Sequence, residues 1–230
     1  NITFADHETD LYEHFRSLCR DVFLYDIGPP QEPGNGARAI RGFICSRFVA
    51  EWLLDQGVAK GEKSAAAMHL PRWIMESEDE MSMASALQPF FDGEGHVCLS
   101  ADSKRASVTV VQARHTDLDF VVLPRRPGWR GIARTLSAGL LARNRVYGIA
   151  VPAFCSALHR SEVLDDASTL LRRLGFNPRL RLSSMYLKDD GFWSANWALS
   201  IGTRESARLA DIGILTQSRK AARLPPAQII

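Results

Sequence analysis

The stretch Ser85-Ala-Leu-Gln-Pro-Phe-Phe-Asp-Gly-Glu-Gly-His-Val97 joins two patterns that are typical of different secondary structures. Its first half continues an apolar pattern with helical spacing, formed by Met83, Ala86, Leu87, Phe90 and Phe91. Residues His96 to Ser100, directly after the glycines, have the composition of a strand. The sequence therefore predicts a helix that ends in an acidic turn and passes at once into a strand.

Two carboxylates, those of Asp92 and Glu94, stand at the end of this predicted helix. The C-terminus of a helix carries partial negative charge, so acidic side chains there are unfavourable unless a cation lies beside them. A bound divalent metal ion would supply that charge. Gly93 and Gly95 permit a sharp turn and close backbone packing at the same place. The turn is thus a candidate metal site, and a simple helix stop is the alternative.

Two stretches on either side of this turn repeat the same order of elements. Each begins with a short apolar run and then a helix whose apolar face is spaced at three and four residues. The faces are formed by Leu11, Tyr12, Phe15, Leu18 and Val22 in the first stretch and by Val163, Leu164, Ala167, Leu170 and Leu174 in the second. Two unrelated α+β stretches are the alternative to an internal repeat.

A predicted hairpin follows each helix. The second consists of 179–187 and 192–201 around the turn Lys188-Asp-Asp-Gly191, and its last strand alternates apolar and polar side chains. The first is less regular, with 23–27 and 37–45 joined by a Pro/Gly loop over 28–36. Both hairpins lead into a short helix, so the order strand, helix, hairpin, helix occurs twice.

These last helices have matching predicted ends. The first spans Ser46 to Gln56 and the second Thr203 to Ile212, with Ser46 and Thr203 as N-caps. Gly57 and Gly213 follow them as left-handed C-terminal residues.

The segment Leu87-Gln-Pro-Phe-Phe-Asp-Gly-Glu-Gly95 resembles the LAGLIDADG motif of homing endonucleases, of the intein-associated or free-standing type. The stretches 53–58, 61–63, 70–74 and 170–176 also look like this family. The resemblance implies an α+β fold: a pseudo-two-fold repeat of αββαββα units that forms a saddle of antiparallel sheets. Residues 1–80 would be a truncated first repeat with its linker, lacking its first helix. Residues 81–230 would be the second repeat, with an insertion at about 112–158.

The resemblance also implies an activity, metal-dependent hydrolysis of double-stranded DNA at a specific site by a monomer acting as a pseudo-dimer. Glu94 would be the catalytic and metal-binding carboxylate, with Gly95 beside it at the metal, and Asp92 would be the structural acid nearer the helix. Mg²⁺ is the expected cofactor, because it prefers carboxylate and phosphate oxygens. Family members often add a lysine near the metal; Lys188 is the first candidate and Lys104 the second, with a solvated turn lysine as the alternative for each.

The DNA contacts are expected on the polar faces of the sheets. Arg179, Arg181 and Ser183 share one side of their strand, and Ser194 and Asn196 lie on the polar side of the next. Arg38 and Arg41 are the corresponding candidates in the first repeat; because they fall on opposite faces, at most one of them would read bases. Lys60 and Lys63 are expected to contact phosphates.

Three features depart from the family pattern. Pro89 stands where the family has a small residue, and it would either loosen the pairing of the motif helices or be tolerated with a bend. No first motif is present, so one of two metal-binding acids is missing as the chain is written. The segment 112–158 carries clustered Arg and Trp residues that would add DNA contacts or form a solvated surface.

Composition restricts the function classes only broadly. The net charge of +2 permits a nucleic-acid partner without requiring one, and the four cysteines form no C-x-x-C pair that would indicate zinc. No apolar stretch has the length of a membrane span and no signal peptide is visible, so we expect a cytoplasmic protein with access to chromosomal DNA and no membrane partner. Two rival functions remain, a non-cleaving DNA-binding protein on the same fold and a protein-interaction module.

Overall fold

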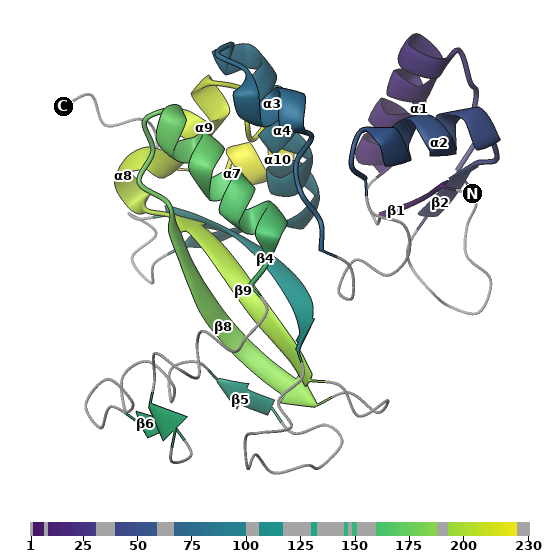
Figure 1. The fold of residues 1–230 in the computed structure, drawn as a ribbon. Coiled ribbons are helices and arrows are strands. Elements are labelled where there is room, and N and C mark those ends of the chain that lie inside the picture. Colours follow the sequence, from purple (N-terminus) through teal and green to yellow (C-terminus); the bar gives the residue numbers. More distant parts are fainter. Residues whose placement is uncertain are drawn as a thin grey trace. The chain divides into compact units, whose positions relative to one another are not determined.

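The computed structural model describes residues 2–6, 9–30, 40–58, 67–99, 106–116, 130–132, 145–146, 149–150, 160–187 and 193–224. The chain divides into two compact units, Asn1–Val58 and Ala59–Ile230. Both units combine helices with antiparallel strands, which places the protein in the α+β class (Figure 1). None of the helices within these ranges is long and apolar enough to cross a membrane.

The first unit contains two strands and two helices. In chain order they are β1 (Ile2–Asp6), α1 (Thr9–Phe23), β2 (Ile40–Ile44) and α2 (Arg47–Asp55). The two strands pair antiparallel, with Ile2 opposite Ile44. Tyr12 of α1 is fully buried over β2, where a Cβ atom on Gly42 would lie 2.6 Å from the Tyr12 hydroxyl. A glycine at position 42 is therefore what allows the helix to approach the strand.

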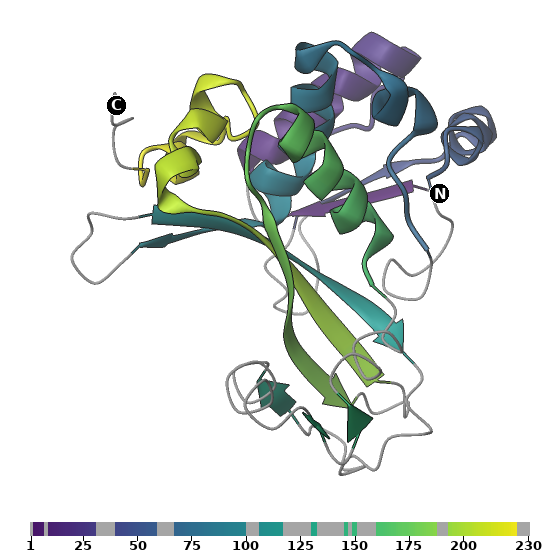
Figure 2. The same cartoon turned by 60° about the vertical axis from the view of Figure 1, so that its left-hand side comes forward.

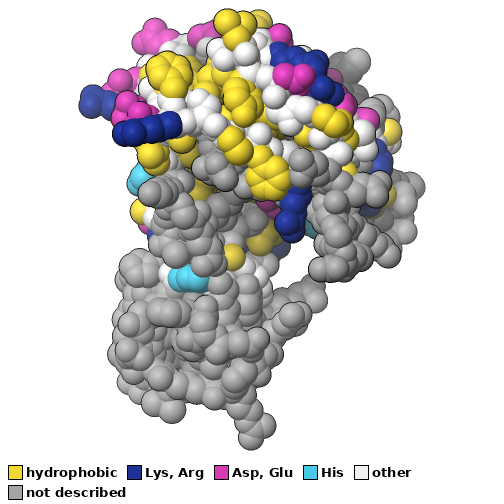
Figure 3. Space-filling model, turned by 90° about the vertical axis from the view of Figure 1, so that its right-hand side faces the viewer, with side chains coloured by type: hydrophobic (Ala, Val, Ile, Leu, Met, Phe, Trp, Pro, Cys, Tyr) yellow, Lys and Arg dark blue, Asp and Glu magenta, His cyan; other side chains and the backbone are white. Residues whose placement is uncertain are grey.

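A small hydrophobic cluster lies in the first unit. Among the side chains that the structure describes, it consists of Cys19, Ile44 and Val49, with Phe15, Phe23 and other partly buried side chains packed against them. The unit leaves large hydrophobic side chains exposed on its surface: Leu18, Val22, Leu24, Phe48, Trp52, Leu54 and Val58. Figure 3 shows exposed hydrophobic side chains on one face of the molecule, with charged side chains among them. Among the described side chains, most of the buried hydrophobic residues belong to the second unit.

The second unit is built on a sheet with the order β3-β4-β9-β8-β5, all of whose neighbours are antiparallel. Its strands are β3 (Gly95–Leu99), β4 (Ala106–Thr116), β5 (Arg130–Ile132), β8 (Arg179–Leu187) and β9 (Trp193–Ile201). A separate pair is formed by β6 (Arg145–Val146) and β7 (Ile149–Ala150). β4 and β9 form the longest pairing, so they are the centre of the sheet.

The helices of this unit lie together on one face of the sheet (Figure 2). They are α3 (Arg72–Glu76), α4 (Glu80–Pro89) with its π-helical extension η1 (Phe90–Glu94), α7 (Glu162–Arg173), α8 (Thr203–Ser206), α9 (Arg208–Asp211) and α10 (Ser218–Ala221). Because the helices share one face, the side chains of each strand alternate between this core and the opposite face.

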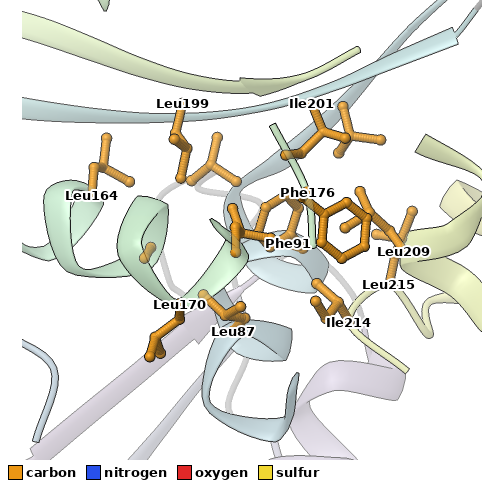
Figure 4. Packing of buried hydrophobic residues seen from close by; sticks show 14 of the residues in the cluster. Leu87, Phe91, Leu164, Leu170, Phe176, Leu199, Ile201, Leu209, Ile214 and Leu215 are labelled. Atoms are coloured by element: carbon orange, nitrogen blue, oxygen red, sulfur yellow. The ribbon is translucent and has the colours of Figure 1, made fainter. Parts of the chain in front are cut away.

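The main core fills the space between the helices and the sheet. Figure 4 shows Phe91 and Phe176 close together, with Leu199 and Ile201 of β9 on the sheet side. Phe91, Leu199 and Ile201 are fully buried. Phe91 therefore anchors the end of the predicted motif helix in the main core, at about 1.5–3 kcal/mol for a side chain of this type.

Several sequence predictions are confirmed. The two repeated helices are α1 and α7, the second hairpin is β8 and β9, and the strand after the acidic turn is β3. Ser46 caps α2, since its side chain accepts a hydrogen bond from the amide of Val49. Gly57 and Gly213 have φ angles of +90° and +77°. These features are local, and periodicity and capping chemistry were enough to predict them.

The predicted first hairpin is wrong. Phe23 is the last residue of α1, residues 24–27 form no strand, and β2 pairs with β1 instead. The reason is that the pairing of β2 is decided by a partner about 40 residues away along the chain, which local alternation does not reveal. β1 and β2 lie on either side of α1 in the chain, and β4 and β9 lie on either side of α7 with other strands between them; both pairs are antiparallel.

A second correction concerns the helix predicted from Thr203 to Ile212. Its N-cap is Gly202, without a side-chain hydrogen bond, and Thr203 is the first helical residue. The helix is recorded as α8 and α9 on either side of Ala207, whose φ and ψ of −61° and −40° are helical. Ser206 donates its hydroxyl to the carbonyl oxygen of Ala106 at 3.0 Å, which ties this helix to the sheet.

The strand β4 reaches Thr116 and so includes the first residues of the segment 112–158, which was predicted as an insertion. Most of that segment lies outside the described residues. The boundary predicted between the repeats at residue 80 stays a prediction.

We expect Leu24→Gly to stabilise the first unit. α1 ends at Leu24 with a φ of +52°, whereas α2, α7 and α9 end at glycines with positive φ. Leu24 is 92% exposed, so its removal forfeits little burial. A non-glycine residue in the left-handed region destabilises the folded state by about 1–2 kcal/mol, and the substitution removes this strain. Glycine also gives the unfolded chain more conformational freedom, which reduces the gain in stability by about 0.5–1 kcal/mol. Urea denaturation should show a gain of roughly 0.5–1 kcal/mol, with Gly57→Ala as a destabilised control; a lower midpoint for Leu24→Gly would contradict this account.

Candidate functional site

The candidate nucleic-acid interface is the face of the second unit's sheet that is opposite the helices. Core residues such as Val108, Val110 and Leu199 identify the covered face, so the alternate residues of each strand lie on the other one. One row of paired residues crosses four strands on this outer face: His96, Thr109, Ser200 and Arg179. The next rows are Val111, Ala198 and Arg181, and then Ala113, Asn196 and Ser184.

This outer face has a distinct charge pattern. The strands β3, β4, β8 and β9 contain no Asp or Glu at any position. Arg179, Arg181 and His96 are exposed on the outer face. The other arginine within these strands, Arg114, is buried on the core face and forms an ion pair with Glu162 at 3.1 Å. The exposed cations therefore have no carboxylate beside them in these strands.

Small polar side chains fill the middle of the outer face. The hydroxyls of Thr109 and Ser200 are 3.1 Å apart, and the Asn196 amide donates to the Ser184 hydroxyl at 2.9 Å. These hydrogen bonds run between strands, so the side chains are held low on the sheet. Val111, Ala198 and Ala113 lie in the same rows, so the outer face combines short polar and apolar side chains with the two exposed arginines of β8.

A β-bulge changes which serine of β8 belongs to this surface. The register shifts between Leu182 and Ser184, so Ser183 has no opposing residue and Ser184 is the partner of Asn196. Sequence alternation alone had placed Ser183 there. Ser194 is on the predicted side of β9, but it is fully buried and its hydroxyl has no hydrogen-bond partner among the described residues. In this structure its hydroxyl is not accessible to a ligand.

The remaining predicted contact residues are distributed as follows. Arg41 is exposed on β2 of the first unit, where it is opposite Ala5. The others lie outside the described residues: Arg38, Lys60, Lys63, Lys104 and Lys188. Among the predicted DNA contacts, the residues that the structure describes are therefore Arg41, Arg179, Arg181, Ser183, Ser194 and Asn196.

The acidic turn stands at one edge of the same sheet, because β3 follows it directly. Pro89 is exposed and has φ and ψ of −59° and −32°, so the chain stays helical through it and continues as the π-helical turn η1. A proline lacks the amide hydrogen of the regular α-helical ladder, and a wider turn is one way to accommodate it. Glu94 is the last residue of η1 and is exposed.

The two glycines of the turn have different roles. A Cβ atom on Gly95 would lie 2.1 Å from the carbonyl oxygen of Phe91, whereas a Cβ on Gly93 would have no heavy atom within 4 Å. The amide of Gly95 donates to the same Phe91 oxygen. Only Gly95 is therefore required by close backbone packing. The prediction of close packing is confirmed for Gly95 and is wrong for Gly93.

Asp92 links the acidic turn to the segment that precedes α10. It is only 4% exposed, and its carboxylate accepts hydrogen bonds from the amides of Thr216 and Gln217 at 2.9 and 3.0 Å. The Thr216 hydroxyl donates at 2.6 Å and the Gln88 amide at 3.2 Å. With four donors around it, this carboxylate fixes the segment before α10 against the motif helix. Its role is structural in this sense.

Lys220 forms further hydrogen bonds between the same two segments, in which the segment around α10 is the donor. Its ammonium group donates to the carbonyl oxygens of Phe91 at 3.4 Å and Gly93 at 3.2 Å, and to that of Asp92. These are carbonyls at the end of a helix, where a cation is favourable. The sequence analysis did not identify Lys220, because it is 126 positions after Glu94 and belongs to no recognisable motif.

The fit of a divalent metal ion to this turn rests on Glu94. Its exposed carboxylate forms no ion pair or hydrogen bond with the part of the chain that the structure describes. Among the residues that the structure describes, no group of three or more His, Cys, Asp or Glu side chains is close enough to hold a metal ion. Glu94 and the backbone of Gly95 could thus supply part of a coordination shell, with the remaining ligands coming from water, DNA phosphate or other parts of the chain.

The contrast between Gly95 and Gly93 is testable. We expect Gly95→Ala to destabilise the second unit by about 2–3 kcal/mol, because backbone must move to relieve the contact with Phe91. Gly93→Ala should leave stability unchanged or raise it slightly, since alanine is favoured in a helical turn and has space here. Thermal denaturation of both variants measures the difference. Equal stability of the two would contradict the assignment of a packing role to Gly95 alone.

Comparison with known proteins adds no assignment to this geometry. No protein-family model matches the chain, and no curated protein matches it. The functional interpretation therefore depends on the sheet face, the acidic turn and their chemistry.

Proposed function

We propose that the protein is a site-specific endonuclease of the LAGLIDADG type, which binds double-stranded DNA on the outer face of its sheet and cleaves it with a metal ion at Glu94. The observation that carries this proposal is the acid-free polar sheet face bearing Arg179 and Arg181, which begins one residue after an exposed carboxylate. A polyanion and the metal that would hydrolyse it are thereby accommodated on adjoining elements.

The charge of the outer face and the small size of its side chains support binding to DNA. Arg179 and Arg181 are two residues apart on one face of β8, about 7 Å along the strand. Arginine side chains form bidentate contacts with phosphate and with guanine. Small residues such as Thr109 and Ser200 on the neighbouring strands β4 and β9 would leave room for a duplex to approach the sheet.

The order of elements also supports the family. If the short strands β5, β6 and β7 between β4 and α7 are counted as an insertion, the second unit from α4 onward follows the order helix, two strands, helix, two strands, helix, formed by α4, β3, β4, α7, β8, β9 and α8. The first unit has β1, α1, β2 and α2, which would correspond to β4, α7, β9 and α8, with no described counterpart of β8, and the pairs β1–β2 and β4–β9 are both antiparallel. This is the arrangement expected if the first unit is a second, shorter copy of the repeat.

The chemistry that Mg²⁺ would supply is activation of water and stabilisation of the leaving oxygen of a phosphodiester. The carboxylate of Glu94 would hold the ion, and Asp92, which is fully occupied by hydrogen bonds, would not. Lys188 and Lys104, which lie outside the described residues, remain the candidates for the catalytic lysine.

A non-cleaving DNA-binding protein on the same fold is the second candidate. It is favoured by one observation: within the described ranges, Glu94 has no other acidic, His or Cys side chains grouped with it to hold a metal. In this alternative, the outer sheet face would have the same role and the acidic turn would only end a helix.

We expect Arg179→Ala and Arg181→Ala each to weaken DNA binding about ten-fold. A variant that loses a phosphate contact should also reduce the slope of log K against log salt by about 0.9. Arg172→Ala is the matched control, because Arg172 is exposed on α7, on the helical side of the unit. Fluorescence anisotropy with a labelled duplex at several salt concentrations measures both quantities. If the two β8 variants bind as Arg172→Ala does, the sheet face is not the interface.

Cleavage is tested with a randomised duplex library and Mg²⁺, comparing the parent protein with Glu94→Gln. We expect cutting at one long site, and we expect Glu94→Gln to abolish it while binding persists, because the substitution removes the metal-binding charge alone. Specific binding without cutting by the parent protein would support the non-cleaving alternative. The absence of any binding at low salt would exclude both candidates.

A further inference from the structure

We infer that Lys220 is a positioning residue for Glu94, so that the segment from Thr216 to Lys220 is part of the proposed metal site although it supplies no ligand. The inference rests on the proposed function. It starts from the hydrogen bonds of Lys220 to the carbonyls of Phe91, Asp92 and Gly93, the three residues immediately before Glu94.

The contacts between the two segments run in both directions, and we call them the clasp. Asp92 accepts hydrogen bonds from Thr216 and Gln217, and Lys220 returns hydrogen bonds to the backbone around Asp92. One turn of α10 joins the two parts, since the amide of Lys220 donates to the carbonyl of Gln217 at 2.9 Å. A displacement of either segment would therefore break several hydrogen bonds together.

Glu94 is held on both sides by this arrangement. On one side, the Gly93 carbonyl is bound by Lys220 at 3.2 Å. On the other, Gly95 donates to Phe91 and begins β3, opposite Val110. The backbone of Glu94 is thereby fixed, and its carboxylate moves only through its own side-chain torsions. Fixing a ligand through its surroundings in this way commonly changes metal affinity by about 10–100-fold.

The charge of Lys220 allows positioning to be separated from simple electrostatics. The Lys220 ammonium group is bound to the carbonyls just before Glu94 and would repel a cation held by the Glu94 carboxylate. Its removal would therefore by itself strengthen metal binding. Loss of backbone order would weaken metal binding instead. The sign of the change in metal affinity therefore shows which effect dominates. The loss of backbone order is the larger effect, so removal of Lys220 weakens metal binding.

The experiment compares Lys220→Met, Lys220→Arg and the control Arg223→Met in the full chain. Arg223 is exposed three residues further along, so the control removes the same charge from the same segment. Amide hydrogen exchange at Gly95, with β9 amides as the internal reference, reports on the clasp. Mn²⁺ titration by electron paramagnetic resonance, with Glu94→Gln as the blank, reports on the metal site.

We expect Lys220→Met to raise exchange at Gly95 at least ten-fold relative to β9 and to weaken Mn²⁺ binding about ten-fold. Lys220→Arg should recover most of both losses, and Arg223→Met should change neither. Unchanged exchange in Lys220→Met would overturn the clasp. Faster exchange with equal or tighter Mn²⁺ binding would leave Lys220 a purely structural role and overturn the positioning. Failure of the parent protein to bind Mn²⁺ through Glu94 would overturn the metal site itself, and with it both the inference and the proposed nuclease. The hydrogen-exchange result would still show whether Lys220 holds the turn in place.

Discussion

The buried carboxylate of Asp92 is the constraint on which the arrangement of the site depends. It takes hydrogen bonds from two backbone amides and a hydroxyl more than 120 residues away, and it is nearly inaccessible to water. A buried charge of this kind is tolerated only when its lone pairs are satisfied. The acid therefore fixes where the chain after α9 must run. It also separates the two carboxylates of the turn, because Asp92 is used inside the fold and Glu94 is left exposed at the edge of the sheet.

The sheet meets a different requirement on each of its faces. Towards the helices, the strands present Val110, Leu199 and Ile201 to the core that contains Phe91. Away from the helices, the strands present short polar and apolar side chains and two exposed arginines, and none of the four strands carries an acid. Acidic residues are uncommon in strands, and Ser194 and Ala198 are buried on this face, so packing and strand propensity account for part of the pattern. The two exposed arginines are the residues that the proposed function assigns to an anionic partner.

The two units share part of their order of helices and strands. In each, a helix lies in the chain between two strands that pair antiparallel, β1 and β2 or β4 and β9, although further strands intervene in the second unit. In each, the later strand leads into a helical segment that ends at a glycine with positive φ. Among the described side chains, the hydrophobic cluster of the first unit contains three buried residues, and the helices of this unit leave several large hydrophobic side chains exposed. The strained φ of Leu24, where the other unit has Gly175, shows that the two copies are not equally optimised.

The sequence by itself determined the features that depend on local periodicity and local chemistry. Apolar spacing predicted α1 and α7, alternation predicted β8 and β9, and Ser46 and Gly57 were recognised as caps because their roles involve only neighbouring residues. Only the tertiary structure decided which strands pair, which serine of β8 opposes Asn196, and what surrounds the acidic turn. Lys220 is the clearest case, since its role depends on carbonyl groups that are distant in sequence and that any residue type could have supplied. Backbone groups carry no sequence signature, and contacts made through them therefore become visible only when the chain is folded.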